Sequence, residues 1–484
     1  MMSSTLTASA RALGRNGAAR MSARAFSSAQ AEEIKMLEKL LAEARGREGA
    51  DESKSAAAAA SAGPKFNIGT FNAISPEGLA RFPPSMYDHM AMGSDDAANE
   101  EIHAVLLRSQ KIGSADIPDT VRAIARCGSG TNNIDVEAMT ERGIPVFNTP
   151  GANANAVKEL AVCGILLASR GIVEGISHVH KIVEEEGLDE FPKIKKRVET
   201  DKKMFVGREV AGKKLGIVGL GHIGASVAQT GIALGMDVMG YDPAISLDAA
   251  WRLPGHVLER ASSITELCEQ CDYISLHVPY MKETHHLISA DILKKMKPTC
   301  HIVNFARGEL VDTAAMRSLY DSGDRTGRYI ADFADEFLHD HPKVVLMPHL
   351  GASTAEAEEN AASMAAAEII DFIETGTVIN SVNFPTTKLD AVNAESRRIC
   401  IVNKNVPGML GLITSTLGGS NINIIQQINT SRGNLAYNVI DVADTVSDDE
   451  LVALQADIAK LDGVLSSRVI SSGNAKPGMF SVNK

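Results

Sequence analysis

The chain has few cysteines and aromatic residues, an excess of acidic over basic side chains, and no apolar run of membrane-spanning length. Its 484 residues include six cysteines and one tryptophan, and 60 Asp and Glu against 48 Lys and Arg give a formal net charge of −12. A nucleic-acid surface needs a basic face, so this balance argues against nucleic-acid binding. The lack of a long apolar run argues against a membrane span. At this length the chain is expected to hold two or three domains with ample core.

The six cysteines do not form a disulfide framework. Cys268 and Cys271 form a CxxC pair, but their neighbours in ITELCEQC are acidic and do not stabilise a thiolate. We interpret both as structural residues, and reduced thiols fit a matrix, stroma or cytosol. No His, Cys or Asp cluster has metal-ligand spacing, so the sequence predicts no metal site.

The first 31 residues differ in composition from the rest of the chain. They contain four arginines, many Ser and Ala, and no acidic residue, and the segment SARAFSSAQ resembles a mitochondrial processing site. We predict a transit peptide at 1–31 and a mitochondrial matrix location, with a plastid stroma as the alternative address and a disordered tail as the alternative structure. Residues 32–65 predict a short helix and an alanine-rich linker.

A dinucleotide-binding unit is the strongest local signal. The run LGIVGLGHIG places an apolar strand directly before Gly219, Gly221 and Gly224, and a second apolar run ends at Asp242. Strand, glycine turn, helix, strand and terminal acid together are typical of a Rossmann unit, although a glycine turn in another α/β protein is the alternative. Asp242 would accept hydrogen bonds from the adenosine ribose, and no Lys or Arg follows until Arg252, so NAD is favoured over NADP.

Alternating apolar and helical segments predict two parallel, doubly wound sheets. Residues 66–160 form the start of one open α/β domain, and the helix EAEENAASMAAAEIIDFIETG within 351–390 is expected to return to it. Residues 161–350 continue from the glycine unit through DYISLHVP, HIVNFA, YIADFA and VVLMPH. The nucleotide-binding domain is thus predicted as an insertion into a discontinuous partner, with a cleft between them.

The tail at 397–484 has a different pattern. A strand RICIVNKN, a helix PGMLGLITSTLGG and two strands around the turn SRGN precede a second helix and a last strand, GVLSSRVI. Ser447 and Glu450 form a capping box at the start of that second helix. The order βαββαβ predicts a ferredoxin-like module.

Several of these segments resemble the D-2-hydroxy-acid dehydrogenase family. They are GREVAGKKLGIVGLGHIG, LHVP at 276–279, NFARGELVD at 304–312 and MPHLGAST at 347–354. The segments RCGSGTNNID and GIPVFNTPGANANAVKEL, with a terminal NxPGML module, are similar to the members that oxidise phosphoglycerate. The resemblance implies a flavodoxin-like substrate domain, a Rossmann NAD domain and a ferredoxin-like tail that resembles an ACT regulatory domain.

The resemblance also implies three catalytic side chains. His349 would be the acid/base, since imidazole has a pKa near working pH. Arg307 would grip the substrate carboxylate with its planar guanidinium. Glu336 would hydrogen-bond to the histidine and raise its pKa. This acid lies four residues after Asp332, where many relatives have five, so Asp335 remains a competitor for the role.

For the substrate phosphate, the resemblance implies Arg108 and Asn153, beside a helix start with free N–H groups. Position alone suggests Lys158 as an added charge, and suggests that Gly130 and Thr131 shape the turn beside the carboxylate, with ordinary structural roles as the alternative. Cofactor contacts besides the three glycines and Asp242 are expected at His222, Ile223, His277, Pro279 and Asp332, although packing is the favoured role for both histidines.

The tail could bind an amino-acid effector. Asn405 and Asn423 match asparagines that hold amino acids between paired ACT modules, but some serine-inhibited relatives have a histidine where Asn403 stands here. Serine sensing, another effector and simple dimerisation all stay open. Pairing of the tails, combined with a nucleotide-domain dimer, would build a symmetric homotetramer.

The expected activity is the NAD-dependent oxidation of 3-phospho-D-glycerate to 3-phosphohydroxypyruvate, the first step of L-serine biosynthesis. A hydroxypyruvate or glyoxylate reductase of the same family is the alternative enzyme. An NAD-sensing scaffold, similar to transcriptional corepressors that share this fold, is the alternative from another class. Arg108 and Asn153 separate the enzymes, because only a phosphorylated substrate needs both.

Overall fold

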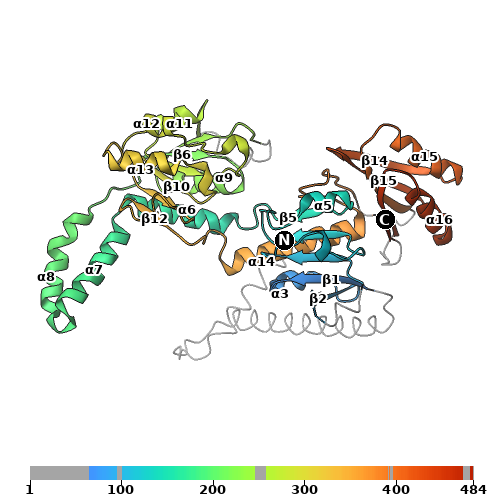
Figure 1. The fold of residues 1–484 in the computed structure, drawn as a ribbon, viewed down its shortest axis with the longest axis horizontal. Helices are drawn as coiled ribbons and strands as arrows, with labels where there is room; N and C mark the ends of the chain where they lie inside the picture. The colour runs from blue at the N-terminus through green and yellow to red at the C-terminus, as the bar shows by residue number, and fades with distance from the viewer. Residues whose placement is uncertain are drawn as a thin grey trace, which may run out of the picture. The chain divides into compact units, whose positions relative to one another are not determined.

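The computed structural model describes residues 65–94, 101–245, 258–390, 392, 396–471 and 480–482, which form three sheets with helices packed on them (Figure 1). The predicted transit peptide, and the predicted linker up to residue 64, lie outside the described residues. Two sheets are parallel and one is antiparallel. The predicted fold class of two doubly wound sheets and a ferredoxin-like tail is confirmed.

The first sheet has five parallel strands in the order β2-β1-β3-β4-β5, which is the flavodoxin-like order. The strands are β1 (Phe66–Phe71), β2 (Tyr87–Ala91), β3 (Ala104–Leu107), β4 (Ala123–Arg126) and β5 (Val146–Asn148). The helices associated with this sheet are α3 (Pro76–Leu79), α5 (Val136–Glu141) and α14 (Ala355–Thr375), with a 3-10 turn, η1, at Ser114–Asp116. As predicted, the late helix α14 returns to this sheet, where alanines such as Ala361 and Ala365 pack into its core.

The second sheet has seven parallel strands in the order β12-β11-β10-β9-β6-β7-β8. They are β6 (Lys214–Val218), β7 (Asp237–Tyr241), β8 (Leu258–Arg260), β9 (Tyr273–Leu276), β10 (His301–Asn304), β11 (Tyr329–Ala331) and β12 (Val344–Leu346). The chain reverses its direction of winding between β6 and β9, and dinucleotides bind at such a switch point. Helices α9 (His222–Ala233), α11 (Ile264–Gln270), α12 (Ala290–Lys295) and α13 (Thr313–Asp321) belong to this sheet, with short 3-10 turns η4 (Lys282–Thr284) and η5 (Gly308–Leu310).

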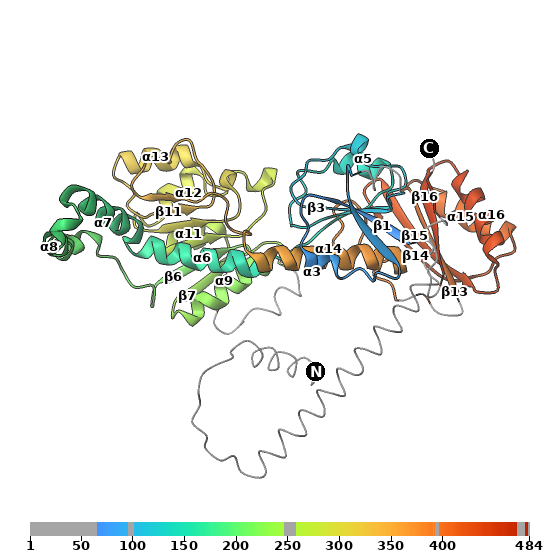
Figure 2. The same cartoon turned by 90° about the horizontal axis from the view of Figure 1, so that it is seen from below.

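Helix α6 (Ala154–Ser169) belongs to the seven-stranded sheet along its whole length. Val157, Ala161, Ile165 and Ala168 are buried in the core formed with β6 and β10, and Figure 2 shows α6 beside α9. The predicted domain boundary at residue 160 therefore falls inside a helix, and a boundary before Ala154 fits this packing better. Among the described residues, no single helix is long and apolar enough to cross a membrane, although α6 and the next helix, α7 (Ile172–Glu186), meet that criterion together as a pair bent by 66°.

Two further helices, α7 (Ile172–Glu186) and α8 (Phe191–Asp201), lie side by side and form an arm after α6 (Figure 1). The short turns η2 (Leu188–Glu190) and η3 (Lys202–Phe205) bound α8. Charged contacts tie the two helices together, including a 2.9 Å hydrogen bond between Nε2 of His178 and Asp201. The arm keeps large apolar side chains exposed, among them Ile176 at 56% and Phe191 at 53%.

The tail forms an antiparallel sheet in the order β14-β15-β13-β16-β17, with the predicted βαββαβ succession and one extra edge strand. Its elements are β13 (Ser396–Lys404), α15 (Met409–Gly419), β14 (Ile424–Arg432), β15 (Leu435–Ala443), α16 (Asp448–Ala459), β16 (Val464–Ser471) and β17 (Phe480–Val482). The predicted capping box is present, because the hydroxyl of Ser447 accepts from the backbone N–H of Glu450 and the Glu450 carboxylate accepts from Ser447.

Candidate active site

The glycine loop after β6 has the geometry of a dinucleotide cradle. Gly219 adopts a left-handed conformation (φ 89°), and a Cβ atom there would lie 2.5 Å from the carbonyl oxygen of His277. A Cβ atom at Gly224 would lie 1.8 Å from the carbonyl oxygen of Gly219, so both positions require glycine. A Cβ atom at Gly221 would meet nothing within 4 Å, which leaves open space at the start of α9. Backbone N–H groups and the helix dipole favour a pyrophosphate in that space.

Asp242 lies directly after β7 and fixes the same loop. Its carboxylate accepts a 2.8 Å hydrogen bond from the backbone N–H of Leu220 and a 2.9 Å bond from that of Ala244. A carboxylate has about four acceptor positions, so capacity remains for ribose hydroxyls. This arrangement fits NAD, and the negative charge disfavours a 2′-phosphate.

The other predicted cofactor residues surround the glycine loop. His222 is the first residue of α9, and its ring lies 2.9 Å from where a Cβ atom of Gly151 would be. Ile223 packs against the core below the loop.

His277 shares a 2.8 Å hydrogen bond with the hydroxyl of Ser275, and burial lowers its pKa to about 4, so it stays neutral at working pH. Pro279 follows at the exposed end of the same segment.

Arg307 lies at the turn after β10, and a buried asparagine holds that turn. The amide of Asn304, which is fully buried, donates a 2.8 Å hydrogen bond to the carbonyl oxygen of Arg307, and its oxygen accepts from the N–H of Ala306. The Arg307 side chain is exposed, and one of its terminal nitrogens lies 3.5 Å from where a Cβ atom of Gly130 would be. The guanidinium therefore reaches across to the turn of the first sheet that the sequence predicts beside the substrate carboxylate.

His349 lies in an exposed turn that a buried aspartate holds in place. Its backbone is left-handed (φ 60°), and its ring makes an edge contact with Phe333 at 5.3 Å between centroids. The carboxylate of Asp332 accepts hydrogen bonds of 2.7 Å and 2.6 Å from the N–H groups of Leu350 and Gly351. Asp332 is 1% exposed, and both of its carboxylate oxygens bind the turn that carries His349, so the expected cofactor contact at this residue stays a prediction.

The loop that follows Asp332 carries the two candidate partners of the histidine. Asp335 accepts 2.9 Å hydrogen bonds from the N–H groups of Phe337 and Leu338, so its carboxylate stabilises its own loop. Glu336 is exposed, and within the described residues its side chain has no hydrogen bond to His349. Of the two acids, only Glu336 has a carboxylate without a hydrogen bond among the described residues. The predicted hydrogen bond between Glu336 and His349 is not formed in this structure.

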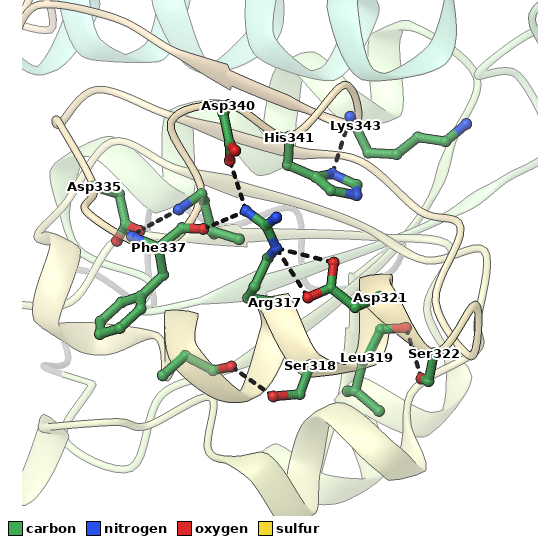
Figure 3. A network of polar contacts seen from close by, with 12 residues as sticks. Arg317, Ser318, Leu319, Asp321, Ser322, Asp335, Phe337, Asp340, His341 and Lys343 are labelled. Carbon is green, nitrogen blue, oxygen red and sulfur yellow. Dashed lines mark hydrogen bonds and ion pairs between the residues drawn. The ribbon is translucent and has the colours of Figure 1, made fainter.

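Figure 3 shows how this loop is braced from α13. Arg317 donates 3.0 Å and 3.1 Å hydrogen bonds to Asp321 on its own helix, a 2.6 Å bond to Asp340, and a 2.9 Å bond to the carbonyl oxygen of Phe337. The carboxylates of Asp340 and Asp321 raise the pKa of Arg317, which keeps its charge. The loop is therefore attached to a helix instead of being held only by its two ends.

Three arginines converge at the carboxyl ends of β3, β4 and β10. Arg126 donates a 3.0 Å hydrogen bond from Nε to the carbonyl oxygen of Arg108, and its terminal nitrogen lies 3.7 Å from where a Cβ atom of Gly130 would be. Burial lowers the pKa of Arg126, and the charges of Arg307 and Arg108 lower it further. Arg108 pairs with Glu358 on the first turns of α14. Like charges gather in this way where an anion binds.

Thr149 and Asn153, which lie between β5 and α6, add two buried polar atoms. The side-chain oxygens of both residues are buried, and neither has a hydrogen-bond partner among the described residues. Asn153 occupies the N-cap position of α6 without capping it, so its side chain is available to a ligand. Lys158 instead binds Asn155 at 2.7 Å and Glu159 at 3.7 Å on its own helix, which favours the structural alternative for this residue.

In the tail, the asparagines singled out by the sequence lie at different depths. Asn405 and Asn423 are exposed, and Asn405 donates a 3.1 Å hydrogen bond to the carbonyl oxygen of Gly433. Asn403 is buried and accepts a 2.7 Å hydrogen bond from Asn438 on the neighbouring strand. Asn403 therefore works inside the sheet, whereas Asn405 and Asn423 remain open to a ligand or a second chain.

Comparisons with known proteins agree with this geometry. Residues 182–351 match the model of the D-isomer specific 2-hydroxyacid dehydrogenase NAD-binding domain. D-3-phosphoglycerate dehydrogenase from Haemophilus influenzae is 31% identical over 399 residues, which cover 79% of this chain and 91% of that protein. The enzyme of that name from Escherichia coli is 30% identical over 401 residues, with the same coverage.

Among solved structures, 3-phosphoglycerate dehydrogenase from Entamoeba histolytica with bound NAD+ superposes with a TM-score of 0.50 at 27% identity, covering 66% of this chain and 99% of that one. The chain belongs to the D-isomer specific 2-hydroxyacid dehydrogenase family. Within that family, it is similar over most of its length to the D-3-phosphoglycerate dehydrogenases.

Sequence reasoning missed three residues of this site. Arg126 ends a buried strand in AIARCGSG, and a charged residue at the carboxyl end of a parallel strand is the signal that could have found it. Asn304 precedes the arginine motif directly and reads as part of a strand. Glu358 lies in a helix rich in acids, and only the three-dimensional contact separates it from its neighbours.

Proposed function

We propose that this chain catalyses the NAD-dependent oxidation of 3-phospho-D-glycerate to 3-phosphohydroxypyruvate. The observation that carries this proposal is the convergence of Arg108, Arg126 and Arg307 near the turn at Gly130. Phosphoglycerate carries a carboxylate and a phosphate of about −1.5 to −2 charge, so it needs more positive charge than a simple hydroxy acid. The similarity to D-3-phosphoglycerate dehydrogenases over most of the chain supports the same substrate.

Each side chain has one task in this reaction. Arg307 binds the substrate carboxylate and polarises the oxygen on C2, because a guanidinium donates two parallel hydrogen bonds. Arg108, Arg126 and the hydroxyl of Thr149 donate to the phosphate, and the unpartnered amide oxygen of Asn153 accepts from a hydroxyl of the substrate. His349 accepts the hydroxyl proton as the C2–H bond breaks. The glycine loop and Asp242 would hold NAD, whose nicotinamide ring would supply the hydride acceptor.

Glu336 would reach His349 when substrate closes the site. A carboxylate beside the ring stabilises the imidazolium that forms as the proton arrives. The exposed position of Glu336 and the braced loop that carries it support this role, since its carboxylate has no other hydrogen bond among the described residues.

The test of the catalytic assignment is His349→Asn. We expect NADH formation from phosphoglycerate to fall by about two to four orders of magnitude, which is the usual contribution of general acid–base catalysis. Binding of NAD, followed by quenching of the protein's fluorescence or by calorimetry, should stay unchanged because His349 is not on the glycine loop. A variant that keeps more than a tenth of the wild-type kcat would contradict the proposed role.

The assembly and the regulation are further proposals. The exposed apolar side chains of the α7–α8 arm support pairing of two chains there, and the exposed Asn405 and Asn423 support an amino-acid site between paired tails, with serine as the candidate effector. Together these contacts would give a homotetramer. Sedimentation equilibrium that shows only monomers would contradict the proposed assembly. Calorimetry that shows no heat on adding serine would contradict the proposed effector site.

A mitochondrial matrix address remains a proposal, supported by the arginine-rich and acid-free leader. Imaging of the full chain with a C-terminal fluorescent tag tests it, and a plastid signal is the alternative outcome.

A further inference from the structure

The arginine cluster contains an acidic side chain that the proposed reaction does not use. Glu358 lies near the start of α14, and its carboxylate forms an ion pair with a terminal nitrogen of Arg108. The two side chains are 41% and 42% exposed, so the pair is accessible to a dissolved anion. An ion pair of this exposure is weak, and a competing anion can exchange with it.

The charge balance of the cluster defines what this carboxylate does. Arg108, Arg126 and Arg307 bring three positive charges, and Glu358 removes one of them, which leaves a net charge of +2. Within the described residues, neither Arg126 nor Arg307 pairs with a carboxylate of its own. A phosphate group alone must displace Glu358 to reach Arg108. A substrate that also presents a carboxylate to Arg307 gains a second charged contact. The free energy of that contact offsets the cost of displacing Glu358 from Arg108.

We propose that Glu358 is a specificity-determining residue that competes with the substrate phosphate for Arg108. This inference rests on the proposed oxidation of a phosphorylated hydroxy acid and adds an electrostatic filter to it. Glu358 weakens the binding of inorganic phosphate and of other small monofunctional anions. It also weakens the hold on the product, which keeps the phosphate group after oxidation and must leave the site.

The same pair has a structural effect in the empty site. Three neighbouring guanidinium groups repel one another, and the carboxylate of Glu358 holds Arg108 at the end of β3 while no anion is bound. A purely structural role would therefore predict weaker substrate binding when Glu358 is neutralised. Competition with the substrate predicts tighter substrate binding when Glu358 is neutralised. The direction of the change in affinity therefore separates the two roles.

Glu358→Gln in the full-length chain tests the proposal. We expect inorganic phosphate to bind about three- to fivefold more tightly in calorimetry, and the KM for 3-phosphoglycerate to fall by a similar factor, as expected for the loss of one exposed charge. The KM for unphosphorylated glycerate should not change. Glu356→Gln is the matched control, because Glu356 is exposed and lies on the same helical turns. This substitution removes the same charge but does not remove the partner of Arg108.

A double-mutant cycle links the effect to Arg108. Glu358→Gln should tighten phosphate binding in the wild-type background and leave it unchanged in an Arg108→Ala background. Weaker or unchanged phosphate binding in Glu358→Gln, or equal tightening in Glu356→Gln, would overturn the competitor role. Phosphate titration needs no turnover, so this result is independent of whether the wild-type chain oxidises phosphoglycerate, which tests the proposed function itself.

Discussion

At the scale of single residues, the site depends on a backbone conformation that histidine seldom adopts. His349 has a φ of 60°, and a left-handed conformation at a residue other than glycine costs on the order of 1–3 kcal/mol unless its surroundings hold it. Asp332 supplies this support through two short hydrogen bonds to the N–H groups of Leu350 and Gly351. We therefore expect the aspartate to act on the proposed reaction through the position of the histidine.

Asp332→Asn should lower kcat by about tenfold or more while the Kd of NAD stays unchanged, since charge-assisted hydrogen bonds contribute about 1.5–3 kcal/mol each. An asparagine offers one acceptor oxygen where the aspartate offers two, so the turn of His349 loosens. Asp312→Asn is the control, because Asp312 also accepts from a backbone N–H, that of Ala315, but at the start of α13. Steady-state kinetics at saturating NAD measure the effect, and equal kcat in both variants would contradict the positioning role.

The sequence predicts the candidate catalytic residues His349 and Arg307 because each one follows a recognisable strand. His349 and Arg307 lie directly beyond apolar runs, where side chains of a parallel sheet face the site. The role of Asp332 and the pairing of Arg108 with Glu358 were beyond prediction. Both depend on which backbone or side chain approaches from a distant part of the chain, and no local pattern encodes that approach.

At the scale of secondary-structure elements, α14 connects the site to the tail. Its first turns hold Arg108 through Glu358, and its last turn is capped by side chains of the antiparallel sheet. Arg468 donates to the carbonyl oxygens of Phe372 and Ile373, and Tyr437 donates a 2.8 Å hydrogen bond to that of Gly376. Cations near the C-terminal end of a helix are stabilised by its dipole. Any shift of the tail sheet therefore acts on the helix that carries Glu358.

A buried acid in the middle of α14 makes this element sensitive to pH. Burial raises the pKa of Glu368 to about 8, and one of its oxygens accepts a 2.8 Å hydrogen bond from Asn380. Its pKa in the unfolded chain is near 4.5, so the folded chain retains a proton that the unfolded chain has released. Stability from this group is full below about pH 4.5 and declines as the pH rises to about 8.

Glu368→Gln should remove this decline, because the amide has the same shape and carries no charge. We expect the variant to be more stable than the wild type at pH 8.5, by up to a few kcal/mol, and to differ little from it at pH 5. Urea unfolding at both pH values measures the difference, with Glu359→Gln on the same helix as a control. A variant that is destabilised equally at both pH values would show that Glu368 acts as an ordinary hydrogen-bonding group.

Elements that rest on strong periodicity were predicted from the sequence, and weakly apolar ones were not. The glycine unit, α14 and the βαββαβ tail all have clear patterns. Helix α8 buries only Ile194, the strand β2 is mostly exposed, and β17 is a three-residue edge. Such elements form because neighbours in the fold hold them, so their own residues give little signal.

At the scale of the whole molecule, two parallel sheets supply opposite halves of one site. The seven-stranded sheet provides the cofactor cradle, Arg307 and His349, and the five-stranded sheet provides Arg108 and Arg126. The guanidinium of Arg307 approaches the turn at Gly130, and the ring of His222 approaches Gly151. The alternation of apolar and helical segments predicts this division only in outline, because the contacts between the two sheets join segments far apart in sequence.

The central claim is that this site oxidises a hydroxy acid that carries a phosphate. Its most direct test is steady-state NADH formation by the full chain with 3-phosphoglycerate against unphosphorylated glycerate, in the wild type and in Arg108→Ala. The account predicts a preference in kcat/KM of about 100-fold or more for the phosphorylated acid, since two charge-assisted contacts contribute about 3 kcal/mol or more, and a loss of most of that preference in the variant. Equal kcat/KM for the two acids would contradict the claim and indicate a general hydroxy-acid dehydrogenase.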